Sequence, residues 1–131
     1  MLYLLDTNIC IYVINERPPE VLQQFLVHEP DGLGISAITA SELYWGVCKS
    51  GSARNLRALE KFIAPLHVMD FGLEAAQAYG QLRATLERKG TPIGPLDLQI
   101  AAHALALDII LVTNNQREFK RVPGLRVENW A

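Results

Sequence analysis

The sequence has few cysteines and no long apolar run. Cys10 and Cys48 are the only cysteines among 131 residues, too few and too unpatterned for a disulfide framework or a cysteine-based zinc site. No apolar stretch approaches the roughly 18 residues that a membrane-spanning helix needs. The start of the chain lacks the basic segment, apolar run and small-residue cleavage site of a secretion signal. We therefore expect a cytoplasmic protein with no membrane partner and with both thiols reduced.

A strong excess of charge is absent as well. Twelve Lys and Arg against fourteen Asp and Glu leave a net charge of -2, so the chain as a whole does not indicate a polyanionic partner. Half of the residues are hydrophobic and a fifth are charged, as in an ordinary globular protein. Basic residues gather in three stretches, which by themselves we interpret as solvated helix faces. We expect one domain over residues 1–131, long enough to bury a core.

Short apolar segments alternate with longer amphipathic ones. The residue pattern predicts strands at residues 2–6, 33–36, 66–71 and 109–113, with a short edge strand within RVENW. It predicts helices at 7–15, from about 19, from Ser36 or Thr39 to 47, and at 54–63, 73–88 and 95–107. Alternation of this kind requires crossover connections and a parallel sheet. The predicted fold is therefore a three-layer α/β/α sandwich with a short central parallel sheet.

Acidic residues follow the expected strand ends. In this architecture the carboxyl ends of strands and the amino ends of helices share one edge of the sheet, where ligands bind. Asp6 ends the first strand, Glu42 lies early in the helix after the second, and Asp97 lies in the first turn of the helix from Pro95. Asn115 and Glu118 follow the strand at 109–113. The topology alone thus places these side chains together.

Each acid also has a purely structural interpretation. Asp6 could cap the following helix, although we assign capping to Thr7 and Asn8. Asp97 could complement the helix dipole. Glu42 is harder to explain in this way, because Ile38 and Trp45 are its neighbours at helical spacing, and a carboxylate on a partly apolar face is costly unless it is paired. Structural roles at all of these positions on one edge would be a coincidence.

The clustered carboxylates indicate a hard divalent cation. Several carboxylates in a low-dielectric cleft require a counter-charge, and Mg2+ takes one or two carboxylates together with water and substrate phosphate. Zinc is disfavoured because His28, His67 and His103 lack ligand spacing; we interpret His103 as a helix-packing residue. A magnesium site of this kind serves phosphoryl chemistry, in which the ion orients a water and stabilises phosphate charge.

Four motifs, in this order and spacing, resemble a known family. LLDTNICIY, ITASELYWG, GPLDLQIAAHA and LVTNN followed by EF are similar to the motifs of PIN-domain ribonucleases, and more closely to those of the VapC toxins of type II toxin–antitoxin systems. The resemblance extends over essentially the whole chain. It implies an endoribonuclease, dependent on Mg2+ or Mn2+, that cuts structured RNA and inhibits translation.

The resemblance also implies roles for single residues. Asp6 and Asp97 would be the principal metal ligands, and Glu42 an acidic ligand or the group that orients the metal-bound water. Thr7, Asn8, Thr113 and Asn115 would support these ligands through hydrogen bonds. Many relatives have an aspartate where this chain has Asn115, and Glu118 is the candidate to replace that missing acid as a catalytic residue. Phosphate contacts are expected from the basic residues that follow the last strand, Arg117, Lys120 and Arg121.

The partners are implied in the same way. The family members usually form homodimers and are inhibited by a cognate VapB-type antitoxin, whose C-terminal segment fills the active-site groove. The complex, often a larger hetero-oligomer, binds operator DNA through the antitoxin. The GPLDLQIAAHA and LVTNN motifs look closest to members whose implied target is a tRNA, namely the anticodon stem-loop of the initiator tRNA.

Three other functions compete with the nuclease interpretation. A response-regulator receiver domain needs a second acid beside Asp6 and a lysine after the last predicted buried strand, and both are missing. An aspartate-nucleophile phosphatase of the D-x-D type needs an acid where this chain has Asn8. The remaining alternative is a catalytically silent PIN fold that binds RNA or protein. The presence of Asp6, Glu42 and Asp97 argues against it.

Overall fold

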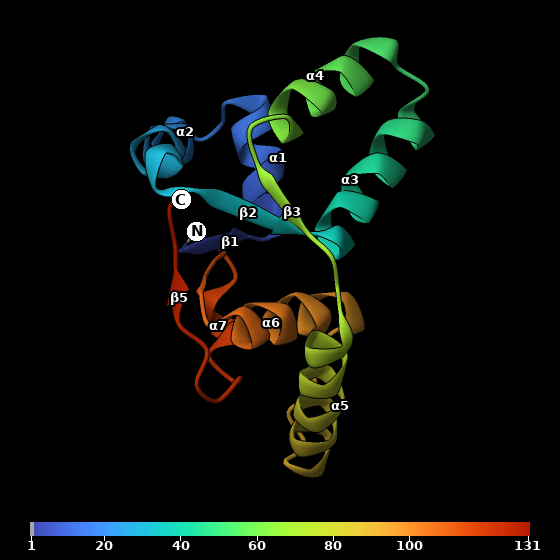
Figure 1. Cartoon of the computed structure of the whole chain (residues 1–131), viewed down its shortest axis with the longest axis vertical. Helices are drawn as coiled ribbons and strands as arrows, with labels where there is room; N and C mark the ends of the chain where they lie inside the picture. Colours follow the sequence, from blue (N-terminus) through green and yellow to red (C-terminus); the bar gives the residue numbers. More distant parts are fainter. Residues whose placement is uncertain (1) are drawn as a thin grey trace.

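A five-stranded parallel sheet forms the centre of the chain, as described here for residues 2–131 of a computed structural model (Figure 1). The strands stand in the order β3-β2-β1-β4-β5, and every neighbouring pair is parallel. Their bounds are β1 Tyr3–Leu5, β2 Leu33–Ser36, β3 His67–Met69, β4 Ile110–Val112 and β5 Val127–Glu128. The first strand of the sequence is therefore the central strand of the sheet.

Helices cover both faces of this sheet (Figure 1). One face carries α1 (Thr7–Asn15), α2 (Pro19–His28), α3 (Ala37–Ser50) and α4 (Ala53–Ile63), and the other carries α5 (Leu73–Arg88), α6 (Pro95–Leu107) and the short α7 (Gln116–Phe119). A single 3-10 turn, η1 (Glu29–Asp31), joins α2 to β2. The predicted three-layer α/β/α architecture is confirmed.

The two hydrophobic cores follow from the alternation of side chains along the strands. Leu5 and Val112 point into the core beneath α1–α4, whereas Leu4 and Leu111 point into the core beneath α5–α7. Successive residues of a strand face opposite sides of a sheet, and all four side chains are fully buried. Strands buried on both faces read as continuous apolar runs. This burial explains why the adjacent pairs Leu4–Leu5 and Leu111–Val112 are both fully apolar.

Most predicted elements agree with the structure to within a few residues. The helices at 7–15, 73–88 and 95–107 have the predicted bounds. The strand expected at 66–71 is shorter, at 67–69, and the helix expected to end at 47 continues to Ser50, where Gly51 closes it in a left-handed conformation with φ 64°. η1 and α7 were not predicted, because elements of three or four residues are too short to show a period. Within residues 2–131, no helix is both long enough and apolar enough to span a membrane.

Candidate active site

Asp6 stands where β1 passes into α1. Its backbone N–H donates to the carbonyl of Val112, 3.0 Å away, which continues the β1–β4 ladder by one residue. Its side chain is buried, and Oδ1 accepts the N–H of Ile9 at 2.9 Å. Asp6 is therefore itself the N-cap of α1. The assignment of capping to Thr7 and Asn8 was wrong, because the strand ends one residue earlier than the predicted strand, with Asp6 already outside it.

Thr7 connects α1 to α3 at the same edge of the sheet. Its Oγ1 donates to Oε1 of Glu42 at 2.7 Å. The Oγ1 atom of Thr39 lies 3.4 Å from Oγ1 of Thr7. Thr39 is fully buried and stands one helical turn before Glu42. Two hydroxyls thus meet beside the Glu42 carboxylate, and one of them restrains it. Thr39 was not among the predicted site residues, although its i, i+3 spacing from Glu42 was a usable signal.

Asp97, Asn115 and Glu118 complete the cluster. Asp97 lies in the first turn of α6 and is half-buried. The Asn115 side-chain amide donates to Oε2 of Glu118 at 3.0 Å, and the Asn115 backbone N–H donates to Oγ1 of Thr113 at 2.9 Å. Asn115 therefore holds Glu118 on one side and Thr113 on the other. Asn115 thus supplies hydrogen bonds, and no charge, at this edge of the sheet.

Burial and neighbouring carboxylates raise the pKa values of Asp6 and Asp97. The pKa of Asp6 is raised from 3.8 to about 6, mainly by burial and in part by the charges of Asp97 and Glu42, while hydrogen bonds from Thr113 and the Ile9 amide oppose the rise. The pKa of Asp97 is also raised, first by burial and then by Glu118 and Glu42. Asp97 and Glu42 therefore lie close enough to act on Asp6, and Glu118 and Glu42 close enough to act on Asp97.

A divalent cation suits this set of donors. All four acids offer hard oxygen ligands, and none of them is in an ion pair with Lys, Arg or His among residues 2–131. As the side chains stand, no three acids, histidines or cysteines in that same range converge on one point at ligand distance. Mg2+ commonly takes only one or two carboxylates and keeps several waters. The buried, uncompensated charge of Asp6 beside Asp97 therefore fits a cation held by these two residues.

The remaining predicted site residues have different surroundings. Asn8 is exposed, and its side chain makes no hydrogen bond within the described residues. Arg117 and Lys120 are exposed on and just after α7, next to Glu118. Arg121 is also exposed, but its Nη1 donates to the carbonyl of Pro92 at 3.2 Å. It thereby ties the end of α7 to the loop that leads into α6 and Asp97.

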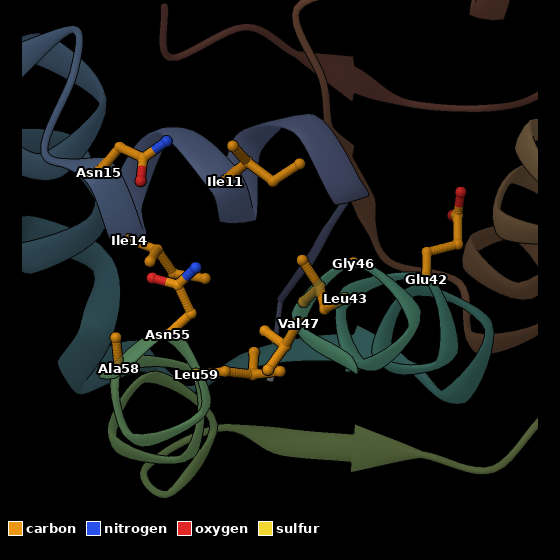
Figure 2. A pocket seen from close by; sticks show the side chains of 10 residues that line it. All are labelled: Ile11, Ile14, Asn15, Glu42, Leu43, Gly46, Val47, Asn55, Ala58 and Leu59. Carbon is orange, nitrogen blue, oxygen red and sulfur yellow. The ribbon is translucent and has the colours of Figure 1, made fainter. Parts of the chain in front are cut away.

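A groove opens beside Glu42 (Figure 2). It encloses about 290 Å³ between α1, α3 and α4 and is lined mainly by apolar side chains. Figure 2 shows Glu42 at one end of the groove, with Asn15 and Ala58 toward the other. Its lining residues are Ile11, Ile14, Asn15, Glu42, Leu43, Gly46, Val47, Asn55, Ala58 and Leu59. An acidic site therefore continues directly into an apolar channel.

Comparison with known proteins identifies the class to which this fold belongs. The family model of the PIN domain matches residues 3–125. The chain is 46% identical over 130 residues to the "tRNA(fMet)-specific endonuclease VapC" of Salmonella typhimurium, covering 98% of each chain. It is 45% identical over 132 residues to "Ribonuclease VapC2" of Rickettsia felis, covering 99% of this chain and 98% of that one.

Solved structures agree. The VapBC2 complex of Rickettsia felis, bound to a DNA fragment from its promoter, contains a chain that matches with a TM-score of 0.91 at 41% identity, covering 100% of each chain. The DNA-bound VapBC of Salmonella typhimurium matches with the same TM-score at 45% identity and the same coverage. The chain therefore belongs to the PIN-domain family and, within it, to the VapC ribonucleases of the VapBC toxin–antitoxin systems. The receiver-domain and phosphatase alternatives are excluded.

Proposed function

We propose that this chain is a metal-dependent endoribonuclease toxin that cleaves structured RNA and so inhibits translation. The observation that carries the proposal is the meeting of Asp6, Glu42 and Asp97 at one sheet edge, although up to 91 positions separate them in the sequence. Three carboxylates without a cationic partner have little use in a purely structural role, because burying them lowers stability. A catalytically silent PIN fold would not need to keep them.

Each residue has a definite part in phosphodiester hydrolysis. Asp6 and Asp97 would hold Mg2+ or Mn2+, which when bound lowers the pKa of a water and stabilises charge on the phosphate. Glu42, restrained by the Thr7 hydroxyl, would accept a proton from the attacking water. Glu118, held by the Asn115 amide, would orient the same water. Arg117 and Lys120, exposed beside this edge, would bind flanking RNA phosphates.

A tRNA is the proposed substrate, specifically the anticodon stem-loop of the initiator tRNA. Support comes from the Salmonella typhimurium relative, which is named a tRNA(fMet)-specific endonuclease and is 46% identical along nearly the whole chain. A nuclease with this substrate would act in the cytoplasm.

The nuclease proposal is tested on total RNA. Purified protein is compared with the Asp6→Asn and Asp97→Asn variants, in Mg2+ and in EDTA, and the new 5′ ends are mapped. We expect cleavage by the wild-type protein in Mg2+ alone, at one position in the anticodon loop of a single tRNA species. Equal amounts of intact RNA from the wild type and both variants would contradict nuclease activity. Cleavage elsewhere would contradict only the substrate.

A VapB-type antitoxin is the proposed partner. The chain matches the solved VapBC complexes along its full length. The apolar groove between α1, α3 and α4 runs directly from Glu42, so an amphipathic peptide lying in it would also obstruct the carboxylates. In this proposal operator DNA is bound through the antitoxin, within a larger hetero-oligomer.

A homodimer is the proposed quaternary state of the toxin. Two large apolar side chains are exposed near the site, Trp45 on α3 at 67% and Leu96 on α6 at 49%, and both line a hollow together with Glu42. Exposed apolar groups that gather on one region are typical of a protein interface. Light scattering of the isolated chain at several concentrations measures this state, and a monomer at all of them would contradict the proposal.

A further inference from the structure

His103 forms the centre of a buried hydrogen-bond chain outside the acidic cluster. It lies on α6, and only 2% of its surface is exposed. Its Nδ1 is 2.8 Å from Oγ of Ser36, a residue 67 positions earlier in the sequence, and its ring also hydrogen-bonds the backbone of Asp70. The edge of the ring packs against Phe71, with the ring centroids 5.4 Å apart. The sequence suggested only a packing residue at this position.

The direction of each hydrogen bond follows from its partners. Oγ of Ser36 accepts the backbone N–H of Ile38 at 3.0 Å, which leaves the Ser36 hydroxyl hydrogen free to be donated. We assign the ring proton to Nε2, on the side of the Asp70 backbone, so that Nδ1 of His103 accepts the Ser36 hydroxyl hydrogen. Nε2–H then donates to the backbone carbonyl of Asp70. The ring is therefore neutral. Burial also favours the neutral form, because it lowers the pKa of His103.

This chain of hydrogen bonds joins the two helices that carry catalytic acids. Ser36 is the last residue of β2 and the N-cap of α3, on which Glu42 lies. His103 lies on α6, less than two turns beyond Asp97. Among residues 2–131, His103 is the one side chain of α6 that hydrogen-bonds another element.

The acidic cluster makes such a connection necessary. The charge of Glu42 disfavours the charged forms of both Asp6 and Asp97. Repulsion across this edge tends to separate α3 from α6. A salt bridge would hold the helices, but its cation would also neutralise charge that a metal requires. A neutral His–Ser hydrogen bond holds them without changing the charge of the site.

We propose that His103, through Ser36, is a positioning residue that fixes Asp97 on α6 relative to Glu42 on α3. The inference rests on the proposed nuclease function and adds a residue that touches neither metal nor RNA. Displacement of a catalytic group by a fraction of an ångström slows chemistry much more than it weakens substrate binding. Loss of the connection should therefore lower kcat and weaken the response to Mg2+, with little change in KM for RNA.

Two substitutions of His103 separate positioning from packing. In His103→Asn the amide oxygen occupies nearly the place of Nδ1, so the bond from Ser36 is kept and that to Asp70 is lost. In His103→Gln the amide nitrogen approaches the place of Nε2, so the bond to Asp70 is kept and that from Ser36 is lost. Both variants lose the ring and its contact with Phe71. The two variants therefore lose the same packing contact, but each keeps the hydrogen bond that the other loses.

The kinetic experiment measures kcat, KM and the Mg2+ concentration for half-maximal activity, well below the Tm of each variant. For His103→Gln we expect kcat to fall about tenfold or more and the Mg2+ requirement to rise several-fold, with KM for RNA within about twofold. For His103→Asn we expect kcat within about threefold of the wild type. Ser36→Ala removes the same bond and also the cap of α3, so adding His103→Gln to it should lower kcat little below that of Ser36→Ala alone.

Two readouts need no RNA cleavage. Nitrogen-15 NMR of the histidine rings should show Nδ1 of His103 unprotonated and Nε2 protonated. Added MgCl2 should raise the Tm of the wild type and of His103→Asn equally, and that of His103→Gln by less. Identical Mg2+ responses in the two variants, or a proton on Nδ1, would overturn the inference. Failure of the wild type to cleave RNA while the NMR and Mg2+ results hold would reject the nuclease proposal and leave the positioning of the acids supported.

Discussion

The Thr7 hydroxyl donates a 2.7 Å hydrogen bond to Oε1 of Glu42, and it thereby joins the first turn of α1 to α3 across the sheet edge. Hydrogen bonds to a charged acceptor are about twice as strong as neutral ones. The first turn of α1 is itself held by Asp6, whose Oδ1 caps the helix. One metal-ligand candidate and one proton-acceptor candidate are thus joined through consecutive residues.

Removing this hydroxyl should impair catalysis more than folding. Thr7→Val keeps the volume of the side chain but leaves Glu42 free to rotate, and we expect kcat to fall about tenfold with a change in Tm of only a few degrees. Thr7→Ser keeps the donor and should stay within about threefold of wild-type kcat. Steady-state cleavage of the mapped RNA measures both. Equal activity of the valine and serine variants would show that the bond has no catalytic role.

Asp6→Asn should stabilise the metal-free protein at neutral pH while abolishing cleavage. The pKa of Asp6 is raised from 3.8 to about 6, so between these values the folded protein binds a proton that the unfolded chain has released. Stability therefore falls as pH rises through that window and stays at the lower value above it. A shift of about two pKa units corresponds to roughly 3 kcal/mol. Asparagine avoids this loss and still caps α1.

Thermal unfolding in EDTA, from pH 3.5 to 8, measures the effect. The Tm of Asp6→Asn should exceed that of the wild type by several degrees above about pH 6, and the difference should vanish below about pH 4. Added Mg2+ should reduce the difference at pH 7.5, because only the wild type gains stability from the ion. A variant less stable than the wild type in EDTA at pH 7.5 would contradict the expected sign.

Asn115→Asp should lower the stability of the metal-free protein and increase the rise in Tm that a bound metal produces. The substitution replaces the hydrogen bond from Asn115 to Glu118 by a second carboxylate beside the first. We expect the metal-free protein to lose about 1–2 kcal/mol and the rise in Tm on adding Mn2+ to increase. Asn115→Ala is the control, since it removes the bond without adding charge. If both variants respond to Mn2+ like the wild type, Asn115 does not face the metal site.

Filling the groove should weaken antitoxin binding and leave the nuclease intact. Gly46 lines the groove, and no atom lies within 4 Å of a Cβ built there. Gly46→Leu would therefore project into the apolar channel without a clash. Gly80 on α5 is also exposed and has equally open surroundings, so Gly80→Leu is the matched control. We expect the Kd for a cognate antitoxin, measured by calorimetry, to rise about tenfold or more for Gly46→Leu alone.

RNA cleavage by the free variants supplies the second measurement. Gly46→Leu should cleave at a rate within about threefold of the wild type, since a Cβ at that position meets no other atom within 4 Å. A Kd unchanged by Gly46→Leu would place the antitoxin elsewhere on the surface.

Arg117 and Lys120 should contribute affinity for RNA through its phosphates. Replacing each by alanine should raise KM and reduce the slope of log KM against log salt by about 0.7 per lost contact. Arg126 is the control, because it is exposed but pairs with Asp108 at 3.3 Å. Arg126→Ala should leave the slope unchanged. An unchanged slope for both Arg117→Ala and Lys120→Ala would remove these residues from the RNA-binding surface.

Local sequence patterns predict much of the fold. The apolar runs LYLL and IILV predicted buried parallel strands, and the periodicity of residues 73–88 and 95–107 predicted two helices with the observed bounds. Parallel topology by itself places Asp6, Glu42 and Asp97 on one edge of the sheet. These features could be predicted because they depend on which residues are buried, and burial leaves a period of two or of about 3.6 in the sequence.

Contacts between individual side chains were decided only by the tertiary structure. Asp6 caps its own helix, Thr7 reaches Glu42 across 35 positions, and His103 reaches Ser36 across 67. A period records which face of an element is buried, but not the partner on the opposite element or the direction of a hydrogen bond. Those depend on differences of an ångström in how α1, α3 and α6 pack on the sheet, and packing at that scale is a property of the whole folded chain.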